Sequence, residues 1–234
     1  RGHTTRLERP NLDSTRHISL NSYFDTVYLH SVGVPNESQR PVEGSLFPVK
    51  GELSETVTVS ADAELVVDAV IGDVRVEATD DTRIQVQAVQ LVRVQTAASA
   101  RAALDALTLT LEQIENRVMV RSAVLDDMAA LGCSSYRVDL QIRCPRTVRL
   151  RIQAASGQTE VTGMANAVVI EQTEGDVAVR NVPAAIDLTA HKGNVRVEES
   201  GGPVTVSAKY GSVDLRQIKG KLTVWCVKGK TVID

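Results

Sequence analysis

The chain has few aromatic residues. Only 3% of its 234 residues are Phe, Trp or Tyr, whereas 43% are hydrophobic, so the core must be aliphatic. No hydrophobic run is long enough to cross a membrane as a helix. The net charge is only −3, which argues against general nucleic-acid binding.

The chain also lacks any motif typical of catalysis, metal binding or cofactor binding. Its four histidines are scattered along the sequence: His3, His17, His30 and His191. Carbohydrate-cleaving enzymes need two carboxylates that converge in one cleft. The acidic residues after position 170 instead fall at different positions of the repeat described below. We therefore predict that the protein is not an enzyme and holds no metal or cofactor.

Cysteine is scarce, and the three residues present suggest different roles. Cys133 and Cys144 flank an expected strand at residues 138–142. They could pair in an exported protein, although the strand between them tends to hold them apart. Cys226 occupies a position that is alanine in the two preceding repeat units, which predicts a buried free thiol.

The chain does have a regular repeat. Glycines stand at Gly157, Gly175, Gly193, Gly211 and Gly229, each eighteen positions after the one before. Apolar residues recur two and four places after most of these glycines, and again eleven and thirteen places after them. This alternation predicts two short strands per unit, each with one buried face, joined by a turn at the glycine.

Units of this kind predict an all-β fold, a single-stranded parallel β-helix in which each coil is one repeat unit. A left-handed helix of three hexapeptides has the same coil length, but steps of six from Val195 reach Gly201 and Ser207, which does not fit. We expect right-handed coiling.

The repeat begins before the glycine series. Leu65, Val67 and Ala69 stand before Gly72 as Leu150, Ile152 and Ala154 stand before Gly157. We therefore assign residues 51–234 to the β-helix, with Leu109/Leu111 and Val118/Val120 as resumed coil. Two insertions interrupt it at about 96–107 and 123–136. The first is a short helix with Thr96 as its N-cap, and the second is one or two helical turns.

Residues 1–50 form an expected N-terminal extension. Residues 1–17 are polar and read as a tail or linker, and residues 18–34 suggest one or two short strands. Such strands could cover an exposed end of the coil.

The segments RCPRTVRLRIQAASGQTEV, GDVAVRNV, GNVRVEES and GSVDLRQI, with the helix-then-strand insertion, carry a family resemblance. Over residues 55–234 the chain resembles the bacterial "putative adhesin" β-helix family of unknown function, related to the head domain of auto-transporter adhesins. The resemblance implies an extracytoplasmic protein of the periplasm or cell surface, with any signal or anchor upstream of Arg1. It implies no catalytic residues.

Two surface sites follow from the register of the repeat. Stacking would line Lys192, Lys209, Tyr210 and Lys228 along one corner, where they could bind an acidic glycan, an anionic polymer or a lipid surface. A row of lysines that serves only solubility is the alternative. Trp225 stands at an outward position of the last unit, so we predict that it is a contact residue covered by residues 18–29 or by another subunit.

Together these features predict a non-enzymatic, adhesin-like or envelope-associated binding or structural domain, with a cell-surface glycan or an envelope protein as its partner. A self-assembling scaffold similar to bactofilins, joined through the C-terminal end, is the alternative. A carbohydrate-active β-helix enzyme is a weaker one.

Overall fold

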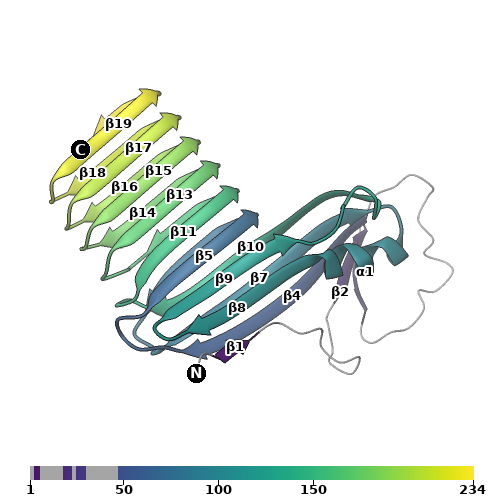
Figure 1. Ribbon diagram of the computed structural model, residues 1–234. Helices are drawn as coiled ribbons and strands as arrows, with labels where there is room; N and C mark the ends of the chain where they lie inside the picture. Colours follow the sequence, from purple (N-terminus) through teal and green to yellow (C-terminus); the bar gives the residue numbers. More distant parts are fainter. Residues whose placement is uncertain (1–2, 6–17, 23–24, 30–46) are drawn as a thin grey trace.

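The computed structural model describes residues 3–5, 18–22, 25–29 and 47–234. Over these residues the protein is all-β except for one helix, α1 (Ala97–Ala106). The strands form two mixed sheets (Figure 1). The tail expected at residues 1–17 lies mostly outside the described residues, as do His17 and His30.

The first sheet, called sheet A, has nine strands. In spatial order they are β1 (His3–Thr5), β8 (Leu107–Ile114), β9 (Arg117–Val124), β5 (Glu64–Ile71), β11 (Arg149–Ser156), β13 (Val168–Glu174), β15 (Ile186–Lys192), β17 (Val204–Tyr210) and β19 (Leu222–Lys228).

The second sheet, called sheet B, has eleven strands. Their order is β20 (Thr231–Ile233), β18 (Val213–Ile218), β16 (Val195–Ser200), β14 (Val177–Val182), β12 (Thr159–Thr162), β6 (Val74–Thr79), β10 (Cys133–Pro145), β7 (Arg83–Val94), β4 (Phe47–Thr58), β2 (Ile18–Ser22) and β3 (Asp25–Leu29).

From β11 onward the chain alternates between the two sheets, and every strand pair is parallel. In sheet A, Val168 pairs with Ile186, Ile186 with Val204, and Val204 with Leu222. Each step is one repeat unit, as the glycine spacing predicts. The strands stack in order toward the C-terminus (Figure 1).

The alternation of apolar and polar residues decides which side chains enter the core. Val179, Val197, Ile186 and Val206 are at most 2% exposed. They lie between the two sheets with the other inward residues of the repeat. Burial of each such side chain contributes about 1.5–3 kcal/mol.

The recurring glycines permit close stacking of the turns. Gly193 has φ of +141°, and a Cβ placed there would lie 2.0 Å from the carbonyl oxygen of Gly175. The residue after each glycine adds a side-chain bond: Asp176 Oδ1 accepts from the Asn194 amide at 2.7 Å, and Asn194 Oδ1 accepts from the Ser212 amide at 3.0 Å. A larger residue than glycine would separate successive coils at this corner.

The structure corrects part of the prediction for residues 51–145. β5 pairs in parallel with β11, and Leu65 lies beside Leu150 as expected, but several other pairs are antiparallel. β7 pairs in this way with both β4 and β10, and β8 forms a hairpin with β9. Leu109 and Val118 therefore do not belong to a resumed coil. The tight turn at Glu115, with φ of +50°, reverses the chain within one sheet instead of carrying it to the other.

The first insertion is the expected helix. Thr96 caps α1 by accepting a hydrogen bond from the Ser99 amide at 3.1 Å, and Ala100, Ala103 and Leu104 are buried. The second insertion is not helical. Residues 123–136 contain the end of β9, a series of turns and the start of β10.

The described N-terminal strands lie at the opposite end of the sheets from the last coil. β1 pairs with β8, while β2 and β3 lie beyond β4 (Figure 1). The prediction that residues 18–29 cover Trp225 is therefore wrong. These strands cover the end that begins the two sheets, because they pair with the long strands there.

Candidate binding surface

The predicted corner row exists in the structure. Glu174, Lys192, Tyr210 and Lys228 follow one another in register at the ends of β13, β15, β17 and β19. We call Lys192, Lys209, Tyr210 and Lys228 the lysine–tyrosine row. They point outward because the preceding inward positions, such as Ala190 and Ala208, are the last that reach the core.

Tyr210 organises the row. The Lys209 Nζ lies 5.4 Å from the centre of the Tyr210 ring, and the Lys228 Nζ lies 5.7 Å from it. The His191 ring meets Tyr210 edge-on at 5.8 Å. Such cation–π contacts contribute about 0.5–1 kcal/mol at exposed sites. One aromatic ring that is 41% exposed therefore holds two ammonium groups close together.

The lysines of the row differ in whether their charge is compensated. Lys192 Nζ pairs with Glu174 Oε1 at 2.5 Å, and this hydrogen bond lowers the pKa of the Glu174 carboxyl. Lys209 and Lys228 form no ion pair with any residue that the structure describes. The uncompensated positive charge of the row is thus at Lys209 and Lys228.

The outer face of sheet B behaves differently, since its charges compensate one another. Arginines and acids alternate in one connected ladder: Arg75, Glu160, Arg180, Glu198, Arg196, Asp214 and Arg216. Hydrogen bonding from Arg216 is the main cause of the lowered pKa of Asp214. This face has little unpaired charge to offer a ligand.

Lysine is distributed very unevenly along the chain. Six of its seven lysines lie from Lys192 to Lys230, and the seventh, Lys50, pairs with Glu52. The sequence prediction included only three of the six. The repeated Lys-Gly-Lys at residues 219–221 and 228–230 was the available signal for the others.

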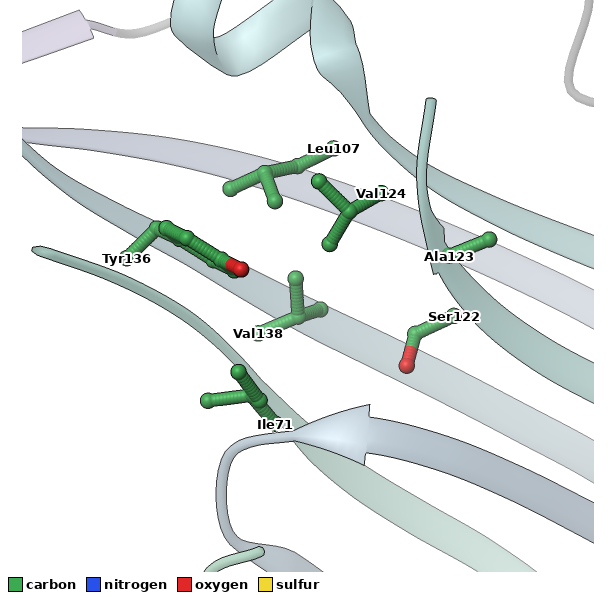
Figure 2. A pocket seen from close by; sticks show the side chains of 7 residues that line it. All are labelled: Ile71, Leu107, Ser122, Ala123, Val124, Tyr136 and Val138. Carbon is green, nitrogen blue, oxygen red and sulfur yellow. The ribbon is translucent and has the colours of Figure 1, made fainter. Parts of the chain in front are cut away.

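Two hollows among the described residues differ in size and place. The first, between the sheets, has a free volume of about 10 Å³. Figure 2 shows that its lining is apolar except for the hydroxyls of Ser122 on β9 and Tyr136 on β10. This volume holds about one water molecule.

The second hollow, of about 220 Å³, is a shallow depression on the outer face of sheet A. Both carboxylates that line it form ion pairs: Asp68 with Arg121, and Glu171 with Arg151. Over the described residues no cluster of His, Cys, Asp and Glu could hold a metal ion.

The three cysteines are free. Cys133 and Cys144 are buried and unpaired, so the disulfide that the sequence left open is not formed. Burial raises the pKa of the Cys144 thiol to about 12, and its sulfur lies 3.8 Å from that of Met164. Cys226 faces inward as predicted, but it is only partly buried because it lies in the last strand of sheet A.

Trp225 is 60% exposed on the outer side of β19, in register with Ser207. The sequence prediction of an outward tryptophan is confirmed. No described segment lies over it, so the second half of that prediction, contact with another molecule, stays a prediction.

No helix among the described residues has the length and apolar character required to span a bilayer. No family model matches the chain, and no curated protein sequence matches it. Solved structures do show similarity. A putative cell adhesion protein from Clostridium sporogenes overlaps with a TM-score of 0.47 at 9% identity, covering 78% of this chain and 98% of that one.

Two further structures come from Parabacteroides. A putative adhesin from P. merdae has a TM-score of 0.25 at 10% identity, and a putative lipid binding protein from P. distasonis has 0.27 at 8%. Each covers 78% of this chain and 95% of its own. The adhesin names agree with the family that the sequence resembles.

Proposed function

We propose that this protein is a non-enzymatic, adhesin-like binding domain of the bacterial cell envelope, and that it binds an acidic glycan through the lysine–tyrosine row. The observation that carries this proposal is the pair of uncompensated ammonium groups of Lys209 and Lys228 on the exposed Tyr210 ring.

The geometry of the row suits a linear polyanion. Successive strands of a sheet lie about 4.8 Å apart, so groups in the row repeat at that spacing along the stack. Each ammonium group donates up to three hydrogen bonds to carboxylate or sulfate oxygens. The exposed face of Tyr210 adds an apolar platform for a sugar ring. A chain of uronic acids that crosses the strands would contact the Lys209 ammonium group, the Lys228 ammonium group and the Tyr210 ring.

The proposal includes the fold that presents the row. We assign residues 149–234 to a right-handed parallel β-helix, supported by parallel pairing in steps of one repeat unit through both sheets. Residues 51–148 continue the same two sheets, with antiparallel strands where the chain returns within one sheet. Such an architecture gives the ligand a rigid linear surface.

The test is titration calorimetry with alginate, a polymer of uronic acids, and with a neutral glucan of similar length. We expect alginate alone to bind. The double variant Lys209→Ala/Lys228→Ala should weaken binding by at least about tenfold, since it removes both uncompensated charges. The control Lys50→Ala/Arg143→Ala removes two charges that are already paired and should change affinity less than about twofold. Equal losses in both variants, or no alginate binding, would overturn the proposal.

A self-assembling scaffold is the second candidate, favoured by the exposed edges of β19 and β20 at one end of the sheets. Light scattering over a range of protein concentrations decides between the two. Growth of long particles in wild type, absent in Trp225→Ala, supports the scaffold. Particles of constant size in both support a binding domain that acts as a single unit.

A further inference from the structure

The last coil, residues 211–234, differs from the coils before it at both of its corners. Each corner carries the sequence Lys-Gly-Lys, at residues 219–221 and 228–230. Eighteen positions earlier, the residues in register are Gly-Gly-Pro at 201–203 and Tyr-Gly-Ser at 210–212. Four lysines are thus confined to one coil.

Residues 209–234 contain six basic and two acidic residues and so have a net charge of +4, whereas the whole chain has −3. The two acidic residues leave the corner lysines free. Asp214 pairs with Arg196 and Arg216, and the pKa of the Arg216 guanidinium is raised by its hydrogen bond to Asp214 and, to a smaller extent, by the negative charge of Asp234. Lys219, Lys221, Lys228 and Lys230 form no ion pair with any residue that the structure describes.

Four of the seven large hydrophobic residues that are exposed among the described residues lie in the same coil. Trp225 is 60% exposed, Val227 is 71% exposed and Ile233 is 60% exposed. The inward residues Leu222 and Val224 are only partly buried, because no described strand pairs with the outer edge of β19. Preceding coils bury the equivalent positions, such as Val204 and Val206, completely.

Trp225 lies on the outer side of β19 in sheet A, in register with Ser207, and Ile233 lies on β20 in sheet B, in register with the inward Leu215. Both are exposed at the same end of the two sheets. A strand advances about 3.3 Å per residue, so the stretch from Lys221 to Lys228 places the two lysine pairs roughly 23 Å apart. Trp225 lies between them on β19. The surface therefore consists of an apolar centre with a tryptophan and a pair of lysines at each side.

We propose that this surface docks the protein on an anionic lipid bilayer. Tryptophan favours the boundary between headgroups and hydrocarbon, where its ring is in an apolar region and its N–H reaches water. Lysines beside an apolar surface bury their stems and extend their ammonium groups to anionic headgroups. The last coil has both features along the same strand edge.

Two other occupants fit less well. A second copy docking through the same surface would bring eight lysines together, and lysine at a strand edge is a common device that prevents such pairing. A soluble polyanion would pair with the lysines but leave Trp225, Val227 and Ile233 in water. This inference does not depend on the glycan proposed for the lysine–tyrosine row.

The chain contains a single tryptophan, so its fluorescence reports on this surface alone. The full chain is titrated with vesicles of phosphatidylcholine alone and with vesicles that also contain phosphatidylglycerol, and binding is also measured by co-sedimentation. We expect a blue shift of Trp225 emission only with the anionic vesicles. The shift should weaken as added salt shortens the range of electrostatic attraction.

Two variants test the two parts of the surface. Each lysine near an anionic membrane strengthens partitioning about fivefold, so Lys219→Gln/Lys221→Gln/Lys230→Gln should weaken it roughly a hundredfold. Val227→Ser keeps the tryptophan reporter and should weaken partitioning several-fold. The control Lys50→Gln/Arg143→Gln/Arg146→Gln removes the same charge from β4, from β10 and from the turn after β10, and should retain most of the binding. Circular dichroism checks that every variant is folded.

The outcomes separate the occupants. Loss of vesicle binding in the corner variant but not in the control supports the proposal. Equal binding to neutral and anionic vesicles, or equal loss in variant and control, overturns it. A blue shift that depends on protein concentration without vesicles shows that a second copy covers the surface, which also overturns it. Lys228 belongs to both surfaces, whereas Lys209 belongs to the row and Lys219, Lys221 and Lys230 belong to the docking surface. Alginate binding is therefore compared in Lys209→Ala and vesicle binding in the corner variant, so the two proposals can fail separately.

Discussion

The substitution Gly193→Ala tests how the coils are held together. A Cβ at this position would lie 2.0 Å from the Gly175 carbonyl oxygen and 2.5 Å from its carbon, so the two coils must separate by about 1 Å to relieve the contact. Separation weakens the backbone bonds on either side, from Gly175 N to Lys192 O and from Gly193 N to Tyr210 O, each worth about 1 kcal/mol.

The positive φ adds to this cost. An alanine at φ of +141° costs about 1–2 kcal/mol, and overpacking against a neighbouring backbone costs about 1–3 kcal/mol. We therefore expect Gly193→Ala to lower the free energy of unfolding by about 3–6 kcal/mol. This is a large part of the roughly 5–15 kcal/mol typical of a folded domain.

Gly132→Ala is the matched control. Gly132 also has positive φ, +70°, but a Cβ there would meet only the Ser99 side chain, whose hydroxyl lies 3.5 Å away. Gly132→Ala should lower the free energy of unfolding by about 1–2 kcal/mol, because only the strain of an alanine at positive φ applies there. Urea unfolding followed by circular dichroism measures both variants. A cost for Gly193→Ala within about 1 kcal/mol of the control would show that close stacking of the glycines is not what this position requires.

Three further changes probe the core, the charge ladder and the thiols. Val197→Ala should lower the free energy of unfolding by about 2 kcal/mol because Val197 is fully buried, whereas Val169→Ala on the outer face should cost under about 0.5 kcal/mol; equal costs would contradict the assigned faces. The hydrogen bond from Arg216 holds the pKa of the Asp214 carboxyl below its ordinary value, so the contribution of this carboxylate to stability is present above the ordinary pKa and is lost as the pH falls through the folded pKa. Acid unfolding of Asp214→Asn should therefore depend less on pH below about 4 than that of wild type, and identical profiles would show that the carboxylate contributes nothing. A thiol reagent at pH 8 should label Cys226 first and leave Cys144 unreacted, because burial raises the Cys144 pKa to about 12; fast labelling that survives Cys226→Ser would refute this.

The regular half of the fold could be predicted because its physical requirements repeat. Gly175 and Gly193 stack on each other directly, so every unit needs glycine at that place, and Val177 and Val195 fill the same core position. A requirement that recurs in every unit is visible in one sequence. The lysine–tyrosine row followed from the same register.

Residues 47–145 could not be predicted in the same way. The alternation of Leu109, Leu111, Val118 and Val120 is the same for a parallel coil and for an antiparallel hairpin, because side chains alternate between faces in both. Only the tight turn at Glu115 and Asn116 separates the two possibilities. The position of β2 and β3 depends on pairing with β4, for which the sequence has no repeat to follow.

The sequence also gives no indication of the buried hydrogen bonds around Gln172. Gln172 occupies an inward position that is alanine in the next two units, and its side chain bonds to Thr159 Oγ1 at 2.7 Å and to the Gly157 carbonyl at 2.8 Å. The sequence does not show which groups such a glutamine bonds to, because its partners come from a different part of the folded coil. Its bonds are local to one coil, so it stabilises the fold without contributing to the binding surface.

The most direct test of binding through the lysine–tyrosine row is NMR mapping with a short uronic acid oligosaccharide. The expected result is a set of amide and side-chain shifts confined to residues 191–192, 209–210 and 227–228, with Lys209 and Lys228 ammonium signals among the largest. Shifts centred on the arginine–acid ladder of sheet B, or spread evenly over all exposed basic residues, would contradict the account.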